Sequence, residues 1–262
     1  MGYEAILVES EGFVRTITLN RPERRNAMTS RMQEELIGAM GAAAEDAGCR
    51  VLVFSGAGEG FCAGLDLEQL KGMAGRSAEE HRADAERLAR LFRTLYELPL
   101  PTIAAVHGAA VAGGTGLATI CDYTLAVPGT KFGYTEVRIG FVPALVSAFL
   151  ALQVGDKRAR GLLLSGRLFG VEEAWRLGLV SEIVEGEGLP GRVRELAEAL
   201  GANSSRSMAV TKRLLADQNR VWLDAAIGLA MAANAEVRGT ADFVEGVTAF
   251  LEKRRPVWGG RV

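Results

Sequence analysis

The stretch over residues 102–122 constrains the fold more strongly than any other part of the chain. It starts with small and β-branched residues, Thr102–Val106, a composition typical of a fully buried strand. A glycine-rich turn follows, and residues 117–121 have the composition of a buried helix. A strand that passes through glycines into a helix leaves backbone N–H groups unpaired, and these can hold an anion or a developing oxyanion. The stretch predicts either such a site or a tight strand–helix contact without chemistry.

A second glycine-rich loop, residues 55–67, follows the buried run 51–54, and a short helix is expected to begin near Asp66. Two strand–loop–helix turns can each present one N–H group to the same oxygen, which makes an oxyanion hole. The alternation of strands and helices predicts an α/β fold with parallel strand pairing. The loop also contains Gly58-x-Gly60-x-x-Ala63, close to a dinucleotide-binding fingerprint. We reject that interpretation, because a polar helix replaces the second strand that it requires.

Composition and charge exclude several functional classes. The 262 residues are 48% hydrophobic and 24% charged, as is common for globular enzymes, and the net charge of −2 does not favour nucleic acid as a partner. The three cysteines, Cys49, Cys62 and Cys121, lack metal-ligand spacing, so we expect no metal site and a reducing compartment. No long apolar segment or secretory N-terminus is evident, so we expect a cytoplasmic protein without membrane association.

Hydrophobic periodicity predicts the remaining elements. Residues 3–10 and 13–20 alternate as a β-hairpin, and Ser30 with Gln33 predicts a capping box for a helix that runs to Gly48. A charged helix is expected over residues 76–97 and a strand over 179–184. Beyond residue 190 the pattern is helical throughout, over residues 192–200, 207–217, 222–237 and 241–253. We therefore divide the chain into an α/β core, residues 1–190, and a C-terminal helical segment, residues 191–262.

Two motifs carry a resemblance to a known family. FCAGLDL, followed by HGAAVAGGTGLATICDY, resembles the crotonase family, the enoyl-CoA hydratase and isomerase superfamily, and the match extends from NRPERRNAM to FLEKRR. The resemblance implies a crotonase-like fold of repeated ββα/βαβ units with a C-terminal helical segment. It also implies a homo-oligomer, a trimer or a hexamer made of two trimers. The expected ligand is an acyl-CoA, a substrate carried as a coenzyme A thioester, without a separate cofactor.

The same resemblance assigns the binding residues. It places the oxyanion-hole amides at Leu65 and Gly113, which would stabilise an enolate formed from the thioester. Residues that would contact CoA are Arg25, Ala27, Ala63, Asp66 and Leu67. Lys253 would reach the CoA phosphates of a neighbouring subunit, with an exposed lysine at a helix end as the alternative. Glu23 replaces the usual lysine, so that phosphate contact is not expected.

General acid–base chemistry requires a carboxylate near the acyl chain. The family has one at either or both of two positions, which correspond here to Gly116 and Glu136. Gly116 supplies none, so Glu136 is the predicted catalyst, with a structural acceptor role as the alternative. Its apolar neighbours are expected to raise its pKa. A Gly116→Glu substitution is expected to restore the pair and to raise hydration of short, unbranched enoyl-CoA.

The sequence is compatible with more than one reaction. The run TEVRIGFVPALVSAF, together with Gly116, is similar to the methylglutaconyl-CoA hydratase branch, and bulky residues at 143–147 are expected to narrow or reshape the acyl pocket. A single glutamate also fits a 3,2-enoyl-CoA isomerase. We place an enoyl-CoA hydratase first, the isomerase second and a non-catalytic CoA-ester-binding protein third.

Overall fold

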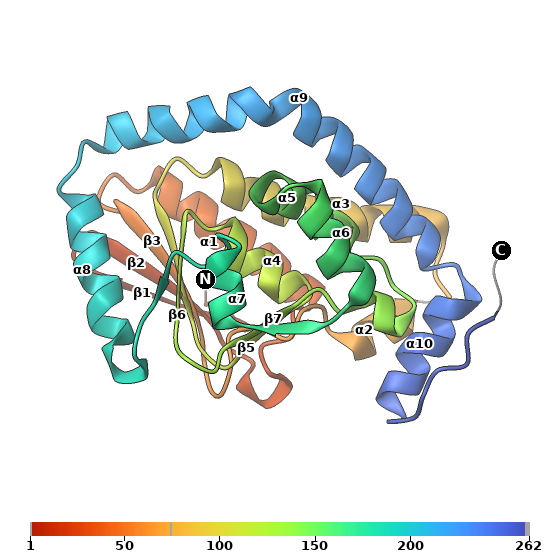
Figure 1. The fold of residues 1–262 in the computed structure, drawn as a ribbon. Coiled ribbons are helices and arrows are strands. Elements are labelled where there is room, and N and C mark those ends of the chain that lie inside the picture. Colours follow the sequence, from red (N-terminus) through yellow and green to blue (C-terminus); the bar gives the residue numbers. More distant parts are fainter. Residues whose placement is uncertain (1, 74, 260–262) are drawn as a thin grey trace.

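A computed structural model describes residues 2–73 and 75–259 (Figure 1). Its larger sheet has six strands in the order β1-β2-β3-β4-β6-β9. The strands are β1 (Ile6–Glu11), β2 (Val14–Leu19), β3 (Val51–Gly56), β4 (Thr102–Val106), β6 (Tyr123–Ala126) and β9 (Glu182–Ile183). Within this sheet, as far as the structure describes it, β1 and β2 pair antiparallel and the other neighbouring strands pair parallel. A smaller sheet joins β5 (Ala109–Val111), β7 (Lys131–Gly133) and β8 (Leu168–Gly170).

Helices cover the sheets. The α-helices are α1 (Ser30–Glu45), α2 (Leu67–Met73), α3 (Ala78–Glu97), α4 (Gly113–Ile120), α5 (Ala144–Val154), α6 (Asp156–Ser165), α7 (Val171–Arg176), α8 (Leu189–Gly201), α9 (Ser205–Val237) and α10 (Ala241–Leu251). The 3₁₀ helices are η1 (Pro22–Arg24), η2 (Glu136–Ile139) and η3 (Gly186–Gly188). Within the described ranges, no helix has both the length and the apolar character needed to cross a bilayer.

The central strand β3 shows why the sheet is buried on both faces. Its residues Val51 and Val53 join a cluster with α8, whereas Leu52 and Phe54 join the main core, to which α1, α3 and α4 contribute. Successive side chains of a strand point to opposite faces, so a run of apolar residues requires cover on both sides. The sequence prediction of an α/β fold with parallel pairing is thereby confirmed.

The N-terminal predictions are confirmed for the hairpin and wrong for the capping box. β1 and β2 pair from Ile6↔Leu19 to Glu11↔Val14. The N-cap of α1 is Thr29, whose Oγ1 accepts a hydrogen bond from the Met32 N–H at 3.2 Å. Ser30 lies inside the helix, and its hydroxyl instead accepts hydrogen bonds from α2 and α3 side chains. The local cap is therefore made one residue earlier than the sequence pattern predicted, and the Ser30 hydroxyl makes tertiary contacts instead.

Two C-terminal predictions also differ from the structure. The two helices expected over residues 207–217 and 222–237 form one helix, α9. Asn219 lies inside this helix, and its side chain donates to the Leu215 carbonyl at 3.0 Å and to the Tyr96 hydroxyl at 3.3 Å. Of the strand expected over 179–184, only β9 is present. The buried Leu179 and Val180 instead direct their N–H groups to the Ala174 carbonyl.

The three C-terminal helices contact different parts of the core (Figure 1). α8 lies on the sheet, α9 crosses α3 and α5, and α10 packs on α2 and η2. Close packing of α10 depends on two glycines: a Cβ on Gly140 would lie 2.1 Å from the Asp242 carbonyl oxygen, and one on Gly246 would lie 2.3 Å from the Ile139 backbone. The division at residue 190 stays a prediction, and α8 begins at Leu189.

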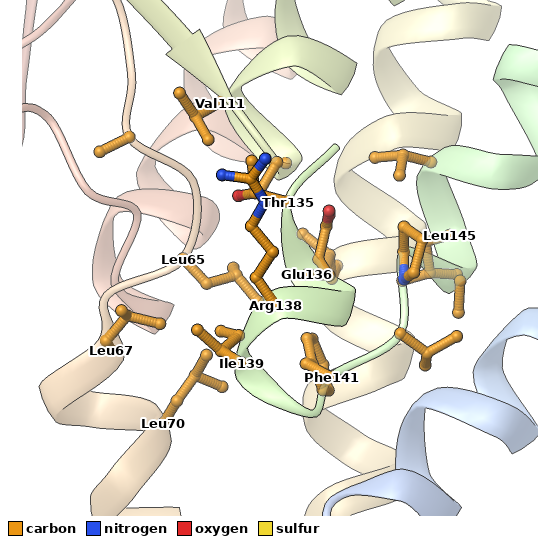
Figure 2. Close-up of a pocket in the computed structure, with 18 of the residues that line it drawn as sticks. Leu65, Leu67, Leu70, Val111, Thr135, Glu136, Arg138, Ile139, Phe141 and Leu145 are labelled. Atoms are coloured by element: carbon orange, nitrogen blue, oxygen red, sulfur yellow. The ribbon is translucent and has the colours of Figure 1, made fainter. Parts of the chain in front are cut away.

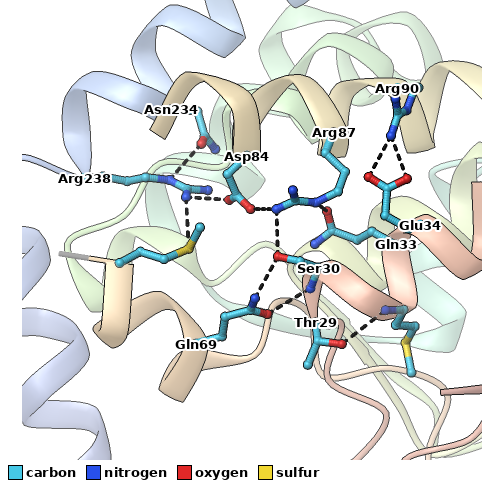
Figure 3. A network of polar contacts seen from close by, with 12 residues as sticks. Thr29, Ser30, Gln33, Glu34, Gln69, Asp84, Arg87, Arg90, Asn234 and Arg238 are labelled. Atoms are coloured by element: carbon cyan, nitrogen blue, oxygen red, sulfur yellow. Dashed lines mark hydrogen bonds and ion pairs between the residues drawn. The ribbon is translucent and has the colours of Figure 1, made fainter. Parts of the chain in front are cut away.

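A buried polar network joins α1, α2, α3 and α9 (Figure 3). Arg238 has no solvent-exposed surface, forms an ion pair with Asp84 at 2.5 Å and donates to Asn234 Oδ1 at 3.1 Å. Asp84 also pairs with Arg87, which donates to the Ser30 hydroxyl at 2.7 Å. Burial lowers the pKa of Arg238 to about 10. The network therefore fixes the end of α9 against the elements that form the cavity described next.

Candidate active site

A cavity of about 530 Å³ lies between the loop after β3, the start of α4, η2, the start of α5 and the C-terminal helices. Most of its lining is apolar. The polar side chains among the lining residues are those of Arg25, Thr135, Glu136, Arg138 and Asn234. Figure 2 shows Glu136 and Arg138 projecting from η2, with Leu65 on one side and Leu145 on the other. Glu136 is the only carboxylate in the lining that the structure describes.

Two backbone N–H groups adjoin this cavity. The Met28 N–H donates to the Gly64 carbonyl at 2.7 Å, and the Asp66 N–H donates to the Met28 carbonyl at 3.1 Å. These bonds hold the loop on either side of Leu65, whose own N–H has no backbone acceptor in the described part of the chain. Gly113 begins α4, so its N–H lies in the first turn, where no intrahelical acceptor exists. Both amides are therefore free to donate to a ligand.

The two free amides come from loops that touch each other. Gly64 has φ +90°, and a Cβ built on it would lie 3.5 Å from the Gly113 nitrogen and 2.9 Å from the Ala112 Cβ. Only glycine permits this backbone conformation with so close an approach. Leu65 follows Gly64 directly, so this contact brings together the two segments that carry the amides of Leu65 and Gly113. The two residues that the sequence resemblance predicted for an oxyanion hole both line the cavity.

Glu136 is the first residue of η2 and is 7% exposed. Its Oε2 has no hydrogen-bond partner among the described residues. Burial raises the pKa of this carboxyl to about 7, and a hydrogen bond from its own backbone N–H opposes the shift only in part. The predicted rise in pKa is confirmed. A carboxyl with this pKa exchanges protons easily near neutral pH.

The residues predicted to contact CoA separate into two groups. Arg25, Ala63 and Leu67 line the cavity. Arg25 has φ 51°, and its carbonyl accepts the Ala63 N–H at 3.0 Å, which ties the basic turn to the loop that carries Leu65.

The second group does not line the cavity and comprises Ala27, Asp66 and Lys253. Asp66 forms an ion pair with Arg21 at 2.9 Å and accepts the Gln69 N–H at 3.1 Å, so its side chain stabilises the start of α2. Lys253 is exposed just beyond α10, with φ 56°. Their assignment to CoA binding stays a prediction.

Several lining residues were not singled out from the sequence. Arg138, two positions after Glu136, is exposed, and its guanidinium has no ion pair or hydrogen bond recorded in the described part of the chain. Its position in the sequence, two residues after the predicted catalyst Glu136, could have marked it as a residue of the site. Phe92, Asn234 and Phe250 come from α3, α9 and α10, and no local pattern indicated that these helices would meet here. Within the described residues, no three His, Cys, Asp or Glu side chains gather in a way that could hold a metal ion.

The bulky segment lies at the cavity, and its effect on the width of the acyl pocket stays a prediction. Pro143, Ala144, Leu145 and Val146, at the start of α5, all line the cavity, whereas Gly116 on α4 is buried behind the lining. His107 does not line the cavity, and its Nε2 lies 2.9 Å from the Gly58 carbonyl oxygen, consistent with a packed residue.

Two sheets joined through glycine-rich turns, with free amides and a buried carboxylate at one cavity, define a crotonase-type fold and site. A crystal structure of an enoyl-CoA hydratase/isomerase from Xanthobacter autotrophicus Py2 has the same fold, with a TM-score of 0.90, 30% identity and coverage of 96% of this chain and 94% of that chain. The chain belongs to the enoyl-CoA hydratase/isomerase family, which matches residues 9–261.

Relatives whose names give different reactions align with this chain over nearly its full length. A Thermus thermophilus protein that carries an enoyl-CoA hydratase name is 44% identical over 250 residues, 94% of this chain and 97% of that protein. The 1,2-epoxyphenylacetyl-CoA isomerase of Escherichia coli K12 is 33% identical over 260 residues, 98% of this chain and 99% of that enzyme. Family membership therefore establishes the class of enzyme but leaves room for both hydration and isomerisation.

Proposed function

We propose that the protein is an enoyl-CoA hydratase that acts on a 2-enoyl-CoA thioester. The observation that carries the proposal is a single buried carboxylate, Glu136, in the same cavity as the free amides of Leu65 and Gly113. The two amides would donate hydrogen bonds to the thioester oxygen, and the apolar lining would hold the acyl chain. The enoyl-CoA hydratase name of the Thermus thermophilus relative supports the same reaction.

The geometry supports a mechanism with one carboxylate. Ionised Glu136 takes a proton from water while the water oxygen bonds to C3. The electron pair of the C2=C3 bond moves through C2 and C1 onto the thioester oxygen, giving an enolate that the Leu65 and Gly113 N–H groups stabilise. The carbonyl then re-forms as Glu136 returns the proton to C2. No second acid or base is required, since the proton removed from water is the one delivered to carbon.

Substrate binding follows from the charges at the cavity. CoA carries phosphate groups, and the exposed cations Arg25 and Arg138 are the lining residues that could pair with them. Lys253 is proposed as a further phosphate contact, made in a neighbouring subunit. CoA enters as part of the substrate, so no separate cofactor is proposed.

A 3,2-enoyl-CoA isomerase is the second candidate. The observation that favours it is that Glu136 is the only carboxylate in the described lining, because moving a proton from C2 to C4 requires one base. The similarity of the segment TEVRIGFVPALVSAF to the methylglutaconyl-CoA hydratase branch supports hydration instead. A non-catalytic CoA-ester-binding protein is third, and the retained Glu136 weighs against it.

The deciding experiment is a panel of enoyl-CoA thioesters followed by ultraviolet absorbance. Hydration removes the conjugated enone absorbance of 2-enoyl esters, whereas isomerisation creates it from 3-enoyl esters. Glu136→Gln is the matched control, because it keeps the shape of the side chain and removes the base. If the wild type isomerises 3-enoyl-CoA and never hydrates a 2-enoyl ester, the first proposal is wrong.

We also propose a homo-oligomer, a trimer or hexamer, working in the cytoplasm. Exposed apolar side chains on α9 support assembly, and they include Leu214, Leu215, Val221, Trp222 and Leu229. Three buried free cysteines are compatible with a reducing compartment. Sedimentation velocity would test the assembly, with a monomer at micromolar concentration as the contrary outcome.

A further inference from the structure

Gly116 lies in α4, one helical turn beyond Gly113, and is buried. A Cβ built on it would lie 2.5 Å from Val146 Cγ1 and 3.4 Å from Phe92 Cζ. Non-bonded carbon atoms have their optimal separation at about 3.5–4.0 Å, so the first of these contacts is a steric clash. A methyl group of Val146 therefore occupies the space into which any side chain at position 116 would extend.

The same methyl group separates Gly116 from the cavity. Val146 and Phe92 line the cavity, whereas Gly116 does not. The ring atom Phe92 Cζ that lies 3.4 Å from the Cβ position of Gly116 also lies 3.8 Å from that of Gly113. This part of the wall is thus adjacent to the predicted oxyanion-hole amide, at the end of the pocket where the reacting carbons would lie.

We propose that Val146 is the residue that sets the acyl selectivity of this enzyme at the reacting end of the pocket. Its side chain closes the space between α5 and the bare backbone of α4, and it presents an apolar surface there. Truncation to alanine opens a recess whose floor is Gly116. Acyl groups with a substituent at the reacting carbons gain from that recess more than unbranched ones. The inference rests on the proposed function, because it assigns the acyl group to this cavity.

The packing also changes the expectation for a second carboxylate. From the sequence, Gly116→Glu was expected to restore a catalytic pair. In the structure, even the Cβ of that glutamate would clash with Val146, so the single substitution must displace α5 or the Val146 side chain. Gly116→Glu alone is therefore expected to lower the melting temperature and not to raise hydration.

The experiment removes the two methyl groups of Val146 from α5 and then adds one methyl group to α4 at position 116. Val146→Ala is expected to raise the ratio of kcat/KM for 3-methylcrotonyl-CoA to that for crotonyl-CoA by about tenfold, the scale of one methylene in an apolar pocket. Adding Gly116→Ala refills part of the recess from α4, at the place that Val146 Cγ1 had occupied, and is expected to return the ratio to within about threefold of wild type. In the single variant Gly116→Ala the new methyl group clashes with Val146, so its melting temperature is expected to be several degrees below that of wild type. Adding Val146→Ala to this variant is expected to recover the lost melting temperature.

Val142→Ala is the matched control, because Val142 also lines the cavity and the substitution removes the same atoms. Its effect on the ratio should not be reversed by Gly116→Ala. The proposal is overturned if Val146→Ala changes the ratio no more than Val142→Ala does, or if Gly116→Ala fails to reverse the change.

Binding of saturated esters separates this inference from the proposed function. Butyryl-CoA and isovaleryl-CoA cannot be hydrated, and calorimetry gives their affinities for each variant. If Val146→Ala shifts the ratio of the isovaleryl-CoA affinity to the butyryl-CoA affinity, the inference is supported, even if no variant hydrates an enoyl ester. A lack of hydration in every variant would count against the proposed function alone. An unchanged affinity ratio overturns the inference even in an active hydratase.

Discussion

At the scale of single residues, Glu136 combines a structural cost with a chemical use. A buried carboxylate oxygen without a partner destabilises the fold when it is charged. The same desolvation raises the pKa of the carboxyl to about 7, so that both protonation states are accessible at neutral pH. Residues of this kind are more common at functional sites than in a core that is only structural.

Glu136→Gln should abolish turnover and leave CoA-ester binding nearly intact. Removing a general acid–base group typically costs about 10²–10⁴ in rate, whereas affinity would come from the rest of the cavity. The measurement is kcat together with the Kd for a saturated acyl-CoA. More than about a tenth of the wild-type rate would remove Glu136 from the mechanism.

The same substitution should change stability in a pH-dependent way. Below the ordinary glutamate pKa the carboxyl is neutral both in the folded and in the unfolded chain, so it contributes no pH-dependent difference. As pH rises towards the folded pKa of about 7, the unfolded chain releases its proton first and wild-type stability falls. The stability of Glu136→Gln relative to wild type should therefore rise between pH 5 and pH 8, by at most about 3 kcal/mol.

Thermal or urea unfolding of both proteins at the two pH values measures this difference. All other titrating groups are common to the pair, so they cancel in the comparison. A difference that is the same at pH 5 and pH 8 would show that the carboxyl titrates as it does in the unfolded chain.

At the scale of elements, the decisive feature is the junction between the Gly64 loop and the start of α4. Gly113→Pro should impair catalysis far more than Leu65→Ala. Proline removes the N–H donor, and loss of one oxyanion donor costs about 2.7–4 kcal/mol, roughly 10²–10³ in kcat, whereas Leu65→Ala keeps its N–H. Circular dichroism must show native folding, and a well-folded Gly113→Pro enzyme with normal activity would contradict the oxyanion hole.

The sequence correctly predicted those helices and strands whose formation depends on neighbouring residues in the chain. β3, β4 and the hairpin follow from apolar runs and alternation. The motifs singled out Leu65, Gly113 and Glu136, and all three line the cavity, whereas their catalytic roles stay predictions. The cap of α1 was wrongly placed because the Ser30 hydroxyl is engaged by Gln69 and Arg87, which are distant in sequence. The contact of Val146 with Gly116 could not be predicted, since it depends on how α4 and α5 pack.

At the scale of the whole molecule, the network around Arg238 holds four helices together (Figure 3). Asp84→Ala should lower the free energy of unfolding by about 3–5 kcal/mol, because it leaves the fully buried Arg238 without its counter-ion. The exposed pair of Arg90 and Glu34 offers a control, and Glu34→Ala should cost no more than about 1 kcal/mol. Equal losses in urea denaturation would show that the buried pair has no special role.

The lining of the cavity is drawn from almost the whole length of the described chain, from Arg25 to Phe250. At a synthesis rate of about 5–20 residues per second, the first of these residues leaves the ribosome roughly 10–45 s before the last. During that interval the apolar walls formed by earlier segments have no cover from α9 and α10. A ribosome-bound chain stalled before α10 should therefore expose this surface to chaperones and should not retain an acyl-CoA, even though Glu136 and both amide donors have already been made.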